Sequence, residues 1–294
     1  MTRQSPRVLA LLAGLTLIWG TNWPLFRVAL AELPVLTFRS IVLTTAIVVL
    51  YVVLRLRRES FAVPHGKWPM LILASLMNIT VWNIATSMAV LYIPSGHASV
   101  LAYTMPLWVA LLGFVVFHQP LSGRLLTAIL IGAAAVVALM APNFASYANA
   151  PWGLFWGLLA GLCWAIGTFV VKRTSWPGMG LSLTFWQIAA SWPPIVLGAI
   201  VIDGLPAHLP STWVLAATLY TGAIPMALGT AAWFALVKLL PAQVAALSSI
   251  AIPIVAVVSG MILLHEPLSL LQAAAIGSTV ISLWLALVPG RRVG

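Results

Sequence analysis

The sequence predicts an all-α membrane protein with ten transmembrane helices, arranged as two inverted repeats of five helices. Three observations predict this fold. Hydrophobic residues make up 62% of the 294 residues and charged residues only 6%, about a quarter of the charge that a soluble domain carries. Apolar segments of membrane-spanning length follow one another with short connections. The second half of the chain also repeats landmarks of the first half.

Prolines, glycines and charge clusters separate the apolar segments. We expect ten spans, at residues 8–30, 34–54, 68–90, 95–117, 123–141, 152–172, 180–202, 212–236, 242–264 and 269–288. The first span begins after Arg3 and Arg7 and continues past Trp19 without a small-residue cleavage site. We therefore interpret it as a retained span and not as a signal peptide. Connections this short leave no soluble domain.

The repeat has a constant offset of 147 residues, half of the 294-residue chain, and needs no gap between its first and last landmarks. It pairs Gly14, Gly20 and Thr21 with Gly161, Gly167 and Thr168, Leu36–Phe38 with Leu183–Phe185, Pro94 and Pro106 with Pro241 and Pro253, and His118–Leu121 with His265–Leu268. We expect residues 1–147 to form the first copy and residues 148–294 the second. Because each copy has an odd number of spans, the second copy enters the membrane from the opposite side.

The positive charges favour one orientation of these spans. With a cytoplasmic N-terminus, 12 of the 14 Lys and Arg residues fall on the cytoplasmic side. They are Arg3, Arg7, Arg55, Arg57, Arg58, Lys67, Arg124, Lys172, Arg173, Lys238, Arg291 and Arg292. Cytoplasmic positive charge is a strong orienting signal, so we expect both termini in the cytoplasm. Arg27 and Arg39 remain near the first outside loop, with Glu32.

The remaining composition excludes several other classes of protein. The net charge of +10 does not indicate nucleic-acid binding, because the basic residues are scattered between apolar runs. The single cysteine, Cys163, excludes an intramolecular disulfide and a cysteine metal cluster, and we interpret it as a small buried apolar residue. We expect no metal and no cofactor. An enzyme would need paired carboxylates, a metal cluster or an activated nucleophile, and the isolated His265–Glu266 pair does not supply one.

The repeat, the ten spans, the stretch Trp19–Asn22 and the two His-x-Pro-Leu corners together resemble the EamA family of the drug/metabolite transporter superfamily. Within it, the aromatic and amide residues look most like those of the YddG-type exporters of aromatic amino acids. The resemblance implies a central cavity lined by spans 1, 3, 4, 6, 8 and 9. It also implies a small-molecule substrate, a bacterial inner membrane and, we expect, a monomer. One position departs from the family pattern: the acidic residue before the corner proline is Glu266 in the second half but Gln119 in the first.

Polar and aromatic residues near the centres of the expected lining spans are candidates for substrate binding. Polar groups at membrane depth tend to face a cavity or a partner helix. The candidates are Trp19, Asn22, Asn78, Trp82, Asn83, Ser99, Tyr103, Trp164, Thr168, Thr230, Ser248 and Ser249. Amides and hydroxyls can bind the amino and carboxylate groups of an amino acid, and indoles can receive its side chain or ammonium group. The alternative is that the hydroxyls bond their own helix backbone and that the tryptophans only pack.

Pro106 and Pro253 are candidates for hinges in spans 4 and 9. Each lies inside a span and cannot donate a hydrogen bond to the residue four positions earlier. Static kinks that shape the cavity are the alternative. We expect His118 and His265 to cap helix corners and His97 to lie at the outer mouth. We expect Arg39 to point outward or to pair with Glu32, outside the substrate path.

The acidic residues bear on energy coupling. Glu32, Glu59, Asp203 and Glu266 all fall at predicted span ends, so no carboxylate is expected near the membrane centre to hold a proton or a cation. A Walker-type phosphate loop is absent, which argues against ATP as the fuel. These features favour a facilitator or weakly coupled exporter of amino acids, aromatic and hydrophobic ones included. The alternatives are export of another small metabolite or organic cation, possible proton coupling, a membrane enzyme, and a non-transporting scaffold or receptor.

Overall fold

The structure is a computed structural model that describes residues 6–118, 123–146, 150–204, 208–233 and 242–287. Within these ranges, the side chains of residues 6–9, 117, 139–146, 150, 242–250, 283, 286 and 287 are outside the description. The described chain forms helices and connecting turns and contains no strand. This confirms the expectation of an all-helical protein.

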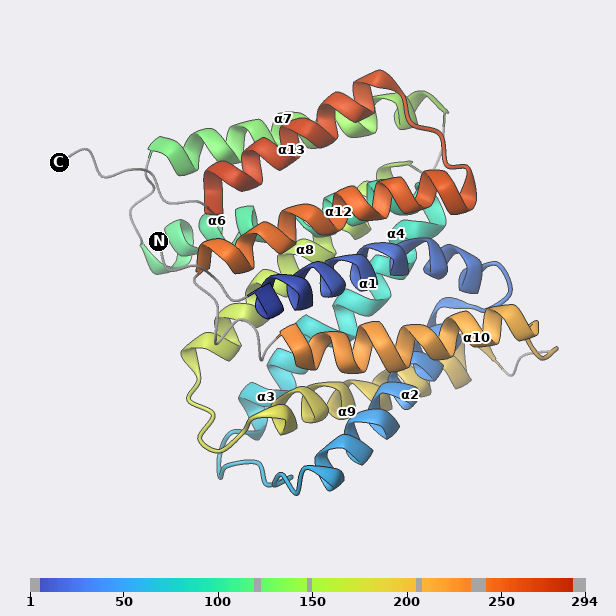
Figure 1. The fold of residues 1–294 in the computed structure, drawn as a ribbon, viewed down its shortest axis with the longest axis vertical. Coiled ribbons are helices and arrows are strands. Elements are labelled where there is room, and N and C mark those ends of the chain that lie inside the picture. The colour runs from blue at the N-terminus through green and yellow to red at the C-terminus, as the bar shows by residue number, and fades with distance from the viewer. Residues whose placement is uncertain (1–5, 119–122, 147–149, 205–207, 234–241, 288–294) are drawn as a thin grey trace.

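The helices follow one another closely along the chain (Figure 1). They are α1 (Pro6–Leu30), α2 (Val35–Leu56), α3 (Trp68–Ser75), η1 (Leu76–Val81), α4 (Trp82–Tyr92), α5 (Ser95–Ala102), α6 (Met105–Phe117), α7 (Gly123–Ser146), α8 (Ala150–Arg173), α9 (Leu181–Gly198), η2 (Ala199–Asp203), α10 (Thr212–Thr221), η3 (Gly222–Gly229), α12 (Ala242–Leu264) and α13 (Leu270–Leu287). Here η marks a π-helical segment. In Figure 1, α7, α13, α12, α1 and α10 run side by side, with α2 and α9 below them.

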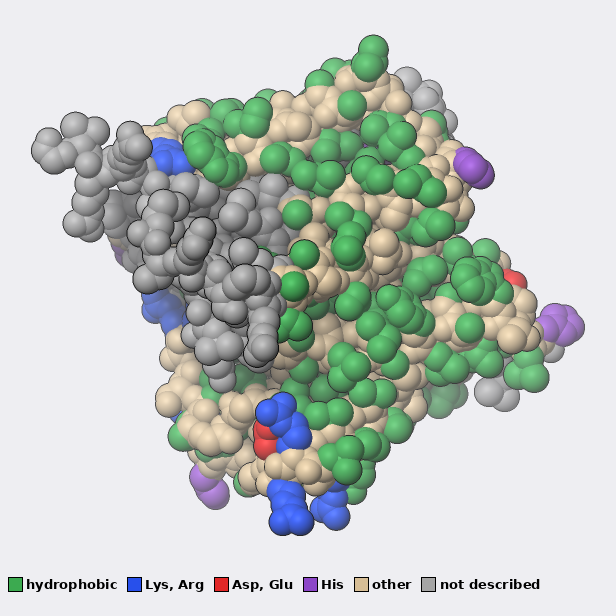
Figure 2. Space-filling view, in the orientation of Figure 1, with side chains coloured by type: hydrophobic (Ala, Val, Ile, Leu, Met, Phe, Trp, Pro, Cys, Tyr) green, Lys and Arg blue, Asp and Glu red, His purple; other side chains and the backbone are tan. Residues whose placement is uncertain are grey.

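Six helical stretches in the described chain are long and apolar enough to cross a membrane. They are Val35–Leu56, Trp68–Tyr92, Ser95–Val116, Pro151–Arg173, Leu181–Asp203 and Thr212–Trp233, and Gly123–Ala138, Ala251–Leu264 and Leu270–Ser282 are shorter apolar helices. Apolar side chains cover the middle of the face shown in Figure 2, and Lys and Arg side chains lie at its left and lower edges. This distribution is that of a multi-pass membrane protein. The count of ten spans and their inversion stay predictions.

Helices distant in sequence pack tightly against one another. α1 lies against α12, and α7 lies against α13. A glycine stands at several of these crossings, and a Cβ atom added at Gly20 would lie 2.4 Å from Val255 Cγ1. Small residues let membrane helices approach this closely, because lipid supplies no hydrophobic force between helices.

All four acidic side chains of the chain accept hydrogen bonds at the first turn of a helix. Glu32 accepts from Ser211 before α10, Asp203 from Thr37 in α2, Glu266 from Ser95 and Gly96 in α5, and Glu59 from Leu181 in α9. The first amide groups of a helix have no partner within it, and the helix dipole favours a negative charge there. These carboxylates therefore fasten helix ends that lie far apart in the sequence.

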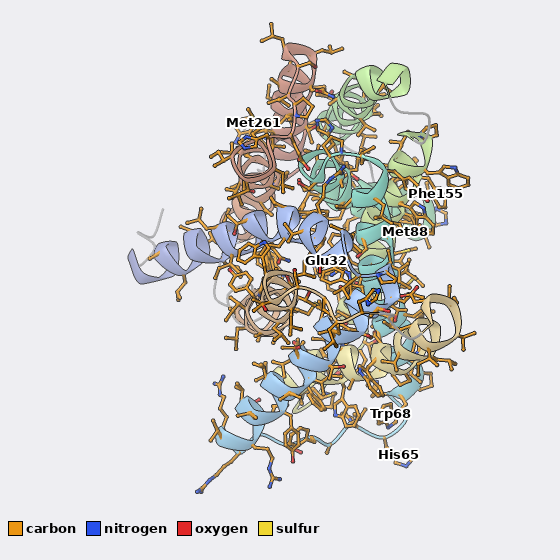
Figure 3. All side chains as sticks on the ribbon, turned by 90° about the vertical axis from the view of Figure 1, so that its right-hand side faces the viewer. Glu32, His65, Trp68, Met88, Phe155 and Met261 are labelled. Carbon is orange, nitrogen blue, oxygen red and sulfur yellow. The ribbon has the colours of Figure 1, made fainter. Side chains whose placement is uncertain are left out.

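Three of the four carboxylate caps lie on one side of the molecule. The turn between α1 and α2, the start of α10 and the end of α12 are all on the right in Figure 1. Figure 3, viewed from that side, shows Glu32 near the middle of the face. The backbone N–H of Ser211 donates to Glu32 Oε2 at 2.6 Å and its hydroxyl to Oε1 at 2.7 Å. These bonds, the backbone one first, hold the pKa of Glu32 below its usual value.

The helix that begins at Trp68 and the one that begins at Thr212 each contain a π-helical segment. These segments are η1 (76–81) and η3 (222–229). Adding 147 to 76 and to 81 gives 223 and 228, so the first segment maps inside the second. π segments are uncommon and frequently lie at functional sites, because the extra residue alters which side chains face inward.

The two prolines predicted as hinges lie in different local structures. The chain leaves α5 after Ala102 and re-enters a helix at Met105, so Pro106 lies in the first turn of α6 and not inside a continuous helix. Pro253 lies inside the uninterrupted helix α12. The chain is thus interrupted just before Pro106 but continuous through Pro253, and the role of the two prolines as hinges stays a prediction. Proline is well tolerated in a first turn, where its missing N–H is not needed.

The two histidine corners are as predicted. His118 ends α6 with a left-handed φ of 50°, and His265 follows α12 with a φ of 53°. Their positions differ by 147 residues (265 − 118). A left-handed residue is a common way to end a helix, although glycine adopts that conformation more readily.

Candidate functional site

A cavity lies between the helices, and its lining comes from α1, α2, η1, α4, the α5–α6 break, α6, α8, α10, η3, residues 230–233 and α12. The lining residues are Trp19, Asn22, Trp23, Phe26, Arg39, Val42, Asn78, Ile79, Trp82, Asn83, Tyr103, Met105, Trp164, Thr221, Pro225, Met226, Thr230, Trp233 and Ile252. The cavity has a volume of about 90 Å³. This is room for several water molecules.

The structure brings most of the predicted binding residues together at this cavity. Those that line it are Trp19, Asn22, Asn78, Trp82, Asn83, Tyr103, Trp164 and Thr230. Ser99 does not line it: its side chain is buried and donates a 2.6 Å hydrogen bond to the Gly96 carbonyl. Thr168 lies on α8 and is not among the lining residues. The side chains of Ser248 and Ser249 lie outside the described part of the chain.

Aromatic rings form much of the wall. The rings of Trp82 and Trp164 lie 4.7 Å apart, and those of Trp19 and Trp233 lie 5.6 Å apart. Tyr103 stands edge-on to Trp82 at 6.4 Å. Tilted and edge-on pairs at these distances are the favoured arrangements of aromatic rings. The faces of such rings suit an apolar side chain or a cation.

Several polar groups of the lining side chains form hydrogen bonds to neighbouring protein atoms. Thr221 Oγ1 donates to Asn22 Oδ1 at 2.9 Å, and Asn83 Nδ2 donates to the Ile79 carbonyl at 2.8 Å. Trp19 Nε1 donates to the carbonyl of Pro225 in η3 at 3.0 Å. These bonds fix the orientation of the residues that line the cavity, as a binding site requires.

Asn78 has unused hydrogen-bonding capacity. Its Nδ2 donates to Gln187 Oε1 at 3.3 Å, and its Oδ1 is buried without a partner in the described structure. A Cβ atom added at Gly167 would lie 2.0 Å from this oxygen. Gly167 therefore leaves the space that the Asn78 amide occupies. A buried polar atom without a partner is unfavourable, and here the oxygen is packed against α8 at Gly167.

Arg39 lines the cavity, contrary to the prediction that it lies outside the substrate path. Its side chain is 2% exposed. Nε donates to the Asn83 carbonyl at 3.0 Å and to Ser87 Oγ at 2.6 Å, and Nη2 donates to Thr86 Oγ1 at 3.0 Å. It does not pair with Glu32, whose carboxylate is bound to Ser211. The reason is the polar face of α4, which accepts the guanidinium inside the molecule.

Helix α2 was also missed as a lining element, since both Arg39 and Val42 contact the cavity. A signal for Arg39 was present in the sequence. An arginine within a membrane span is by default a candidate for a functional site, and Phe38 beside it supplies an aromatic partner. Arg27, the other arginine on this side of the molecule, lies elsewhere. Its Nη1 donates to the carbonyls of Val90 and Ile93 at the end of α4.

Apolar helices around a cavity of aromatic and polar side chains define a multi-pass membrane protein with an internal cavity. The EamA-like transporter family model matches residues 7–141 and 151–288. The chain therefore belongs to the EamA-like transporter family, part of the drug/metabolite transporter superfamily. Members of this family are transporters and not enzymes.

Similar proteins include bacterial transporters. The uncharacterized transporter YvbV of Bacillus subtilis (strain 168) is 25% identical over 279 residues, covering 95% of this chain and 91% of the relative. The uncharacterized transporter YoaV of the same organism is 21% identical over 267 residues, covering 90% and 91%. A solved crystal structure with 17% identity has a TM-score of 0.69 and covers 99% of this chain and 100% of the other. That likeness concerns the fold alone.

Proposed function

We propose that this protein exports amino acids, including aromatic and hydrophobic ones, across the bacterial inner membrane by alternating access. The observation that carries the proposal is the composition of the cavity lining, in which indole and phenol rings stand beside amides, hydroxyls and one guanidinium. Rings suit an apolar or aromatic side chain, and the polar groups suit the amino and carboxylate groups. Ser99 and Thr168, predicted as binding residues, have no contact with the substrate in this proposal. Ser248 and Ser249 stay predictions.

The proposed architecture has ten crossings in two inverted copies, residues 1–147 and 148–294. The separate matches of the family model to the two halves support it, and so do the π segments and histidine corners offset by 147 residues. The distribution of Lys and Arg favours cytoplasmic termini. In this orientation, the side that carries Glu32, Asp203 and Glu266 is the outer side.

The absence of an acidic side chain from the cavity supports a facilitator or a weakly coupled carrier. All four acidic residues of the chain are described, and each caps a helix end away from the cavity. A carrier that exchanges protons for substrate within the membrane generally holds the proton on such a group.

Exchange in proteoliposomes tests the proposal. Vesicles loaded with unlabelled phenylalanine or threonine should accumulate the labelled amino acid by counterflow, with and without an imposed pH gradient. Vesicles without protein, and vesicles loaded with a nucleobase or an organic cation, are the controls. If neither amino acid exchanges while another class moves briskly, the proposed substrate class is wrong.

We expect the helix break before Pro106 to bend during transport. In Pro106→Ala, residue 106 gains an N–H that can bond to the carbonyl of Ala102, which favours one continuous helix in place of α5 and α6. Counterflow of phenylalanine should slow by about tenfold, with little change in the concentration for half-maximal exchange.

The matched control is Pro69→Ala. Pro69 is exposed and also lies in the first turn of a helix, α3, away from the cavity. This variant should exchange at the wild-type rate. An unchanged rate in Pro106→Ala, or equal slowing in both variants, would count against bending at the break.

A further inference from the structure

The cavity has an uncompensated positive charge. Arg39 is the one charged residue among its described lining residues. Each of the four acidic side chains is bound elsewhere, and Glu59 also forms an ion pair with Arg57. Asp203 accepts from Thr37, two residues before Arg39, but forms no ion pair with Arg39. Charged side chains within membrane spans face the bundle interior or a cavity, pair with one another or with backbone carbonyls, and mark the pathways of substrates and ions.

The surroundings of Arg39 hold the guanidinium without neutralising it. Its carbon lies 4.1 Å from the ring centre of Phe26 and 4.7 Å from that of Phe38. The oxygens that accept its hydrogen bonds belong to Asn83, Thr86 and Ser87, all of them neutral. Aromatic faces and neutral oxygens stabilise a cation and fix its plane, but its full charge remains.

The guanidinium also has donors left over. Its hydrogen bonds to described residues use Nε and Nη2, and Nη1 has no acceptor among these residues. A guanidinium presents five N–H groups in a rigid fork that matches the two oxygens of a carboxylate. An arginine held this way, with free donors beside a cavity, is prepared for a charged acceptor that the protein does not supply.

We propose that Arg39 binds a carboxylate of the transported molecule, so that the cavity selects aromatic and apolar carboxylates over amines. This inference rests on the proposed function in so far as the cavity is the substrate site. It goes further because it names the charge that the substrate must carry. The ammonium group of an amino acid then contributes less to binding than its carboxylate does. An organic cation without an acid group is excluded by repulsion from Arg39.

Three ligands that share one aromatic ring separate the two charges. They are phenylalanine, 3-phenylpropionate, which lacks the ammonium group, and phenethylamine, which lacks the carboxylate. Each is tested as a competitor of phenylalanine counterflow and by the ligand-dependent rise in melting temperature of the purified protein. In the wild type, 3-phenylpropionate should compete and stabilise, and phenethylamine should compete at least about tenfold more weakly.

Substitutions at Arg39 identify the group responsible. Arg39→Gln should weaken the binding of 3-phenylpropionate by about 10- to 100-fold and remove the preference for it over phenethylamine. Arg39→Lys should keep the preference with lower affinity, because the charge remains and the two-pronged geometry is lost. Arg27→Gln is the matched control, because Arg27 binds helix-end carbonyls and does not line this cavity. It should leave the order of the three ligands unchanged.

The outcomes separate this inference from the proposed function. If 3-phenylpropionate binds through Arg39 while phenylalanine does not exchange, the anion site stands and amino-acid export fails. If phenylalanine exchanges but phenethylamine competes as well as 3-phenylpropionate, the inference fails and amino-acid export stands. If Arg39→Gln does not fold, the relative affinities of the three ligands for the wild type and for Arg39→Lys still decide whether the cavity selects the carboxylate. Absence of binding by all three to folded wild-type protein overturns both.

Discussion

Replacing Glu266 with glutamine should open the cavity to the outer side of the membrane several-fold more often than in the wild type. The Glu266 carboxylate joins the end of α12 to the start of α5. Its Oε1 accepts from the Ser95 N–H at 2.7 Å, and its Oε2 accepts from the Ser95 hydroxyl at 3.0 Å and the Gly96 N–H at 3.3 Å. Glutamine keeps one acceptor oxygen but loses the charge and the second acceptor.

The size of the effect follows from the strength of such caps. A helix cap is worth about 0.5–2 kcal/mol, and a charge at a helix N-terminus adds up to about 1 kcal/mol when exposed. A loss of about 1–2 kcal/mol from the closed state multiplies the ratio of open to closed molecules by about 5- to 30-fold. The estimate assumes that α5 and α12 separate when the cavity opens to the outer side. The experiment below tests this separation.

Cysteine labelling measures the change directly. Cys163 is the single cysteine, so Cys163→Ala gives a cysteine-free background. Thr230→Cys then places a thiol in the cavity lining. A membrane-impermeant maleimide, applied from outside, should react about 5- to 30-fold faster when Glu266→Gln is present.

Glu59→Gln is the control for this experiment. Glu59 also accepts a hydrogen bond at a helix start, from the Leu181 N–H at 3.3 Å, but on the side that we propose to be cytoplasmic. It should not accelerate labelling from outside. Equal labelling rates in Glu266→Gln and the wild type would show that the Glu266 cap does not control opening to the outside. Faster labelling in Glu59→Gln would show a general loss of stability instead.

The positions of the acidic residues were predictable from the sequence, but their partners were not. Glu32, Glu59, Asp203 and Glu266 interrupt an apolar chain, so they had to lie at span ends. Each partner lies more than a hundred residues away along the chain. Such a pairing depends on which helices are neighbours, and apolar periodicity carries no information on this.

Much of the cavity was predictable for a related reason. Asn22, Asn78 and Asn83 are expensive to place in lipid, so they had to face one another or an internal space. Ser99 was misleading because a hydroxyl can bond its own helix backbone, as it does at Gly96. Arg39 was misplaced because its position near a span end also allows a side chain to reach the membrane surface. The polar face of α4 that binds it could be recognised only with both helices in place.

The prediction with the largest effect on stability concerns Gly222, at the start of η3. A Cβ atom there would lie 2.7 Å from the Val42 carbonyl oxygen and 2.7 Å from Thr45 Cβ, both in α2. Neither atom can be moved by a change of side-chain rotamer, so Gly222→Ala must push η3 away from α2. Overpacking of this kind costs about 1–3 kcal/mol. The melting temperature of the purified protein should fall by several degrees, as measured by thermal unfolding in detergent.

The displacement would also reach the cavity. Thr221 lines it and donates to Asn22 at 2.9 Å, and α2 contributes Arg39 and Val42. Gly222→Ala should therefore reduce the rise in melting temperature that 3-phenylpropionate causes, in addition to lowering the stability of the protein without ligand. Gly14→Ala is the matched control, because a Cβ atom at this helical glycine has nothing within 4 Å. Alanine favours a helix by about 1 kcal/mol over glycine, so Gly14→Ala should melt at or above the wild-type temperature. If Gly222→Ala melted as high as Gly14→Ala, the close approach of α2 and η3 would not be a feature of the folded protein.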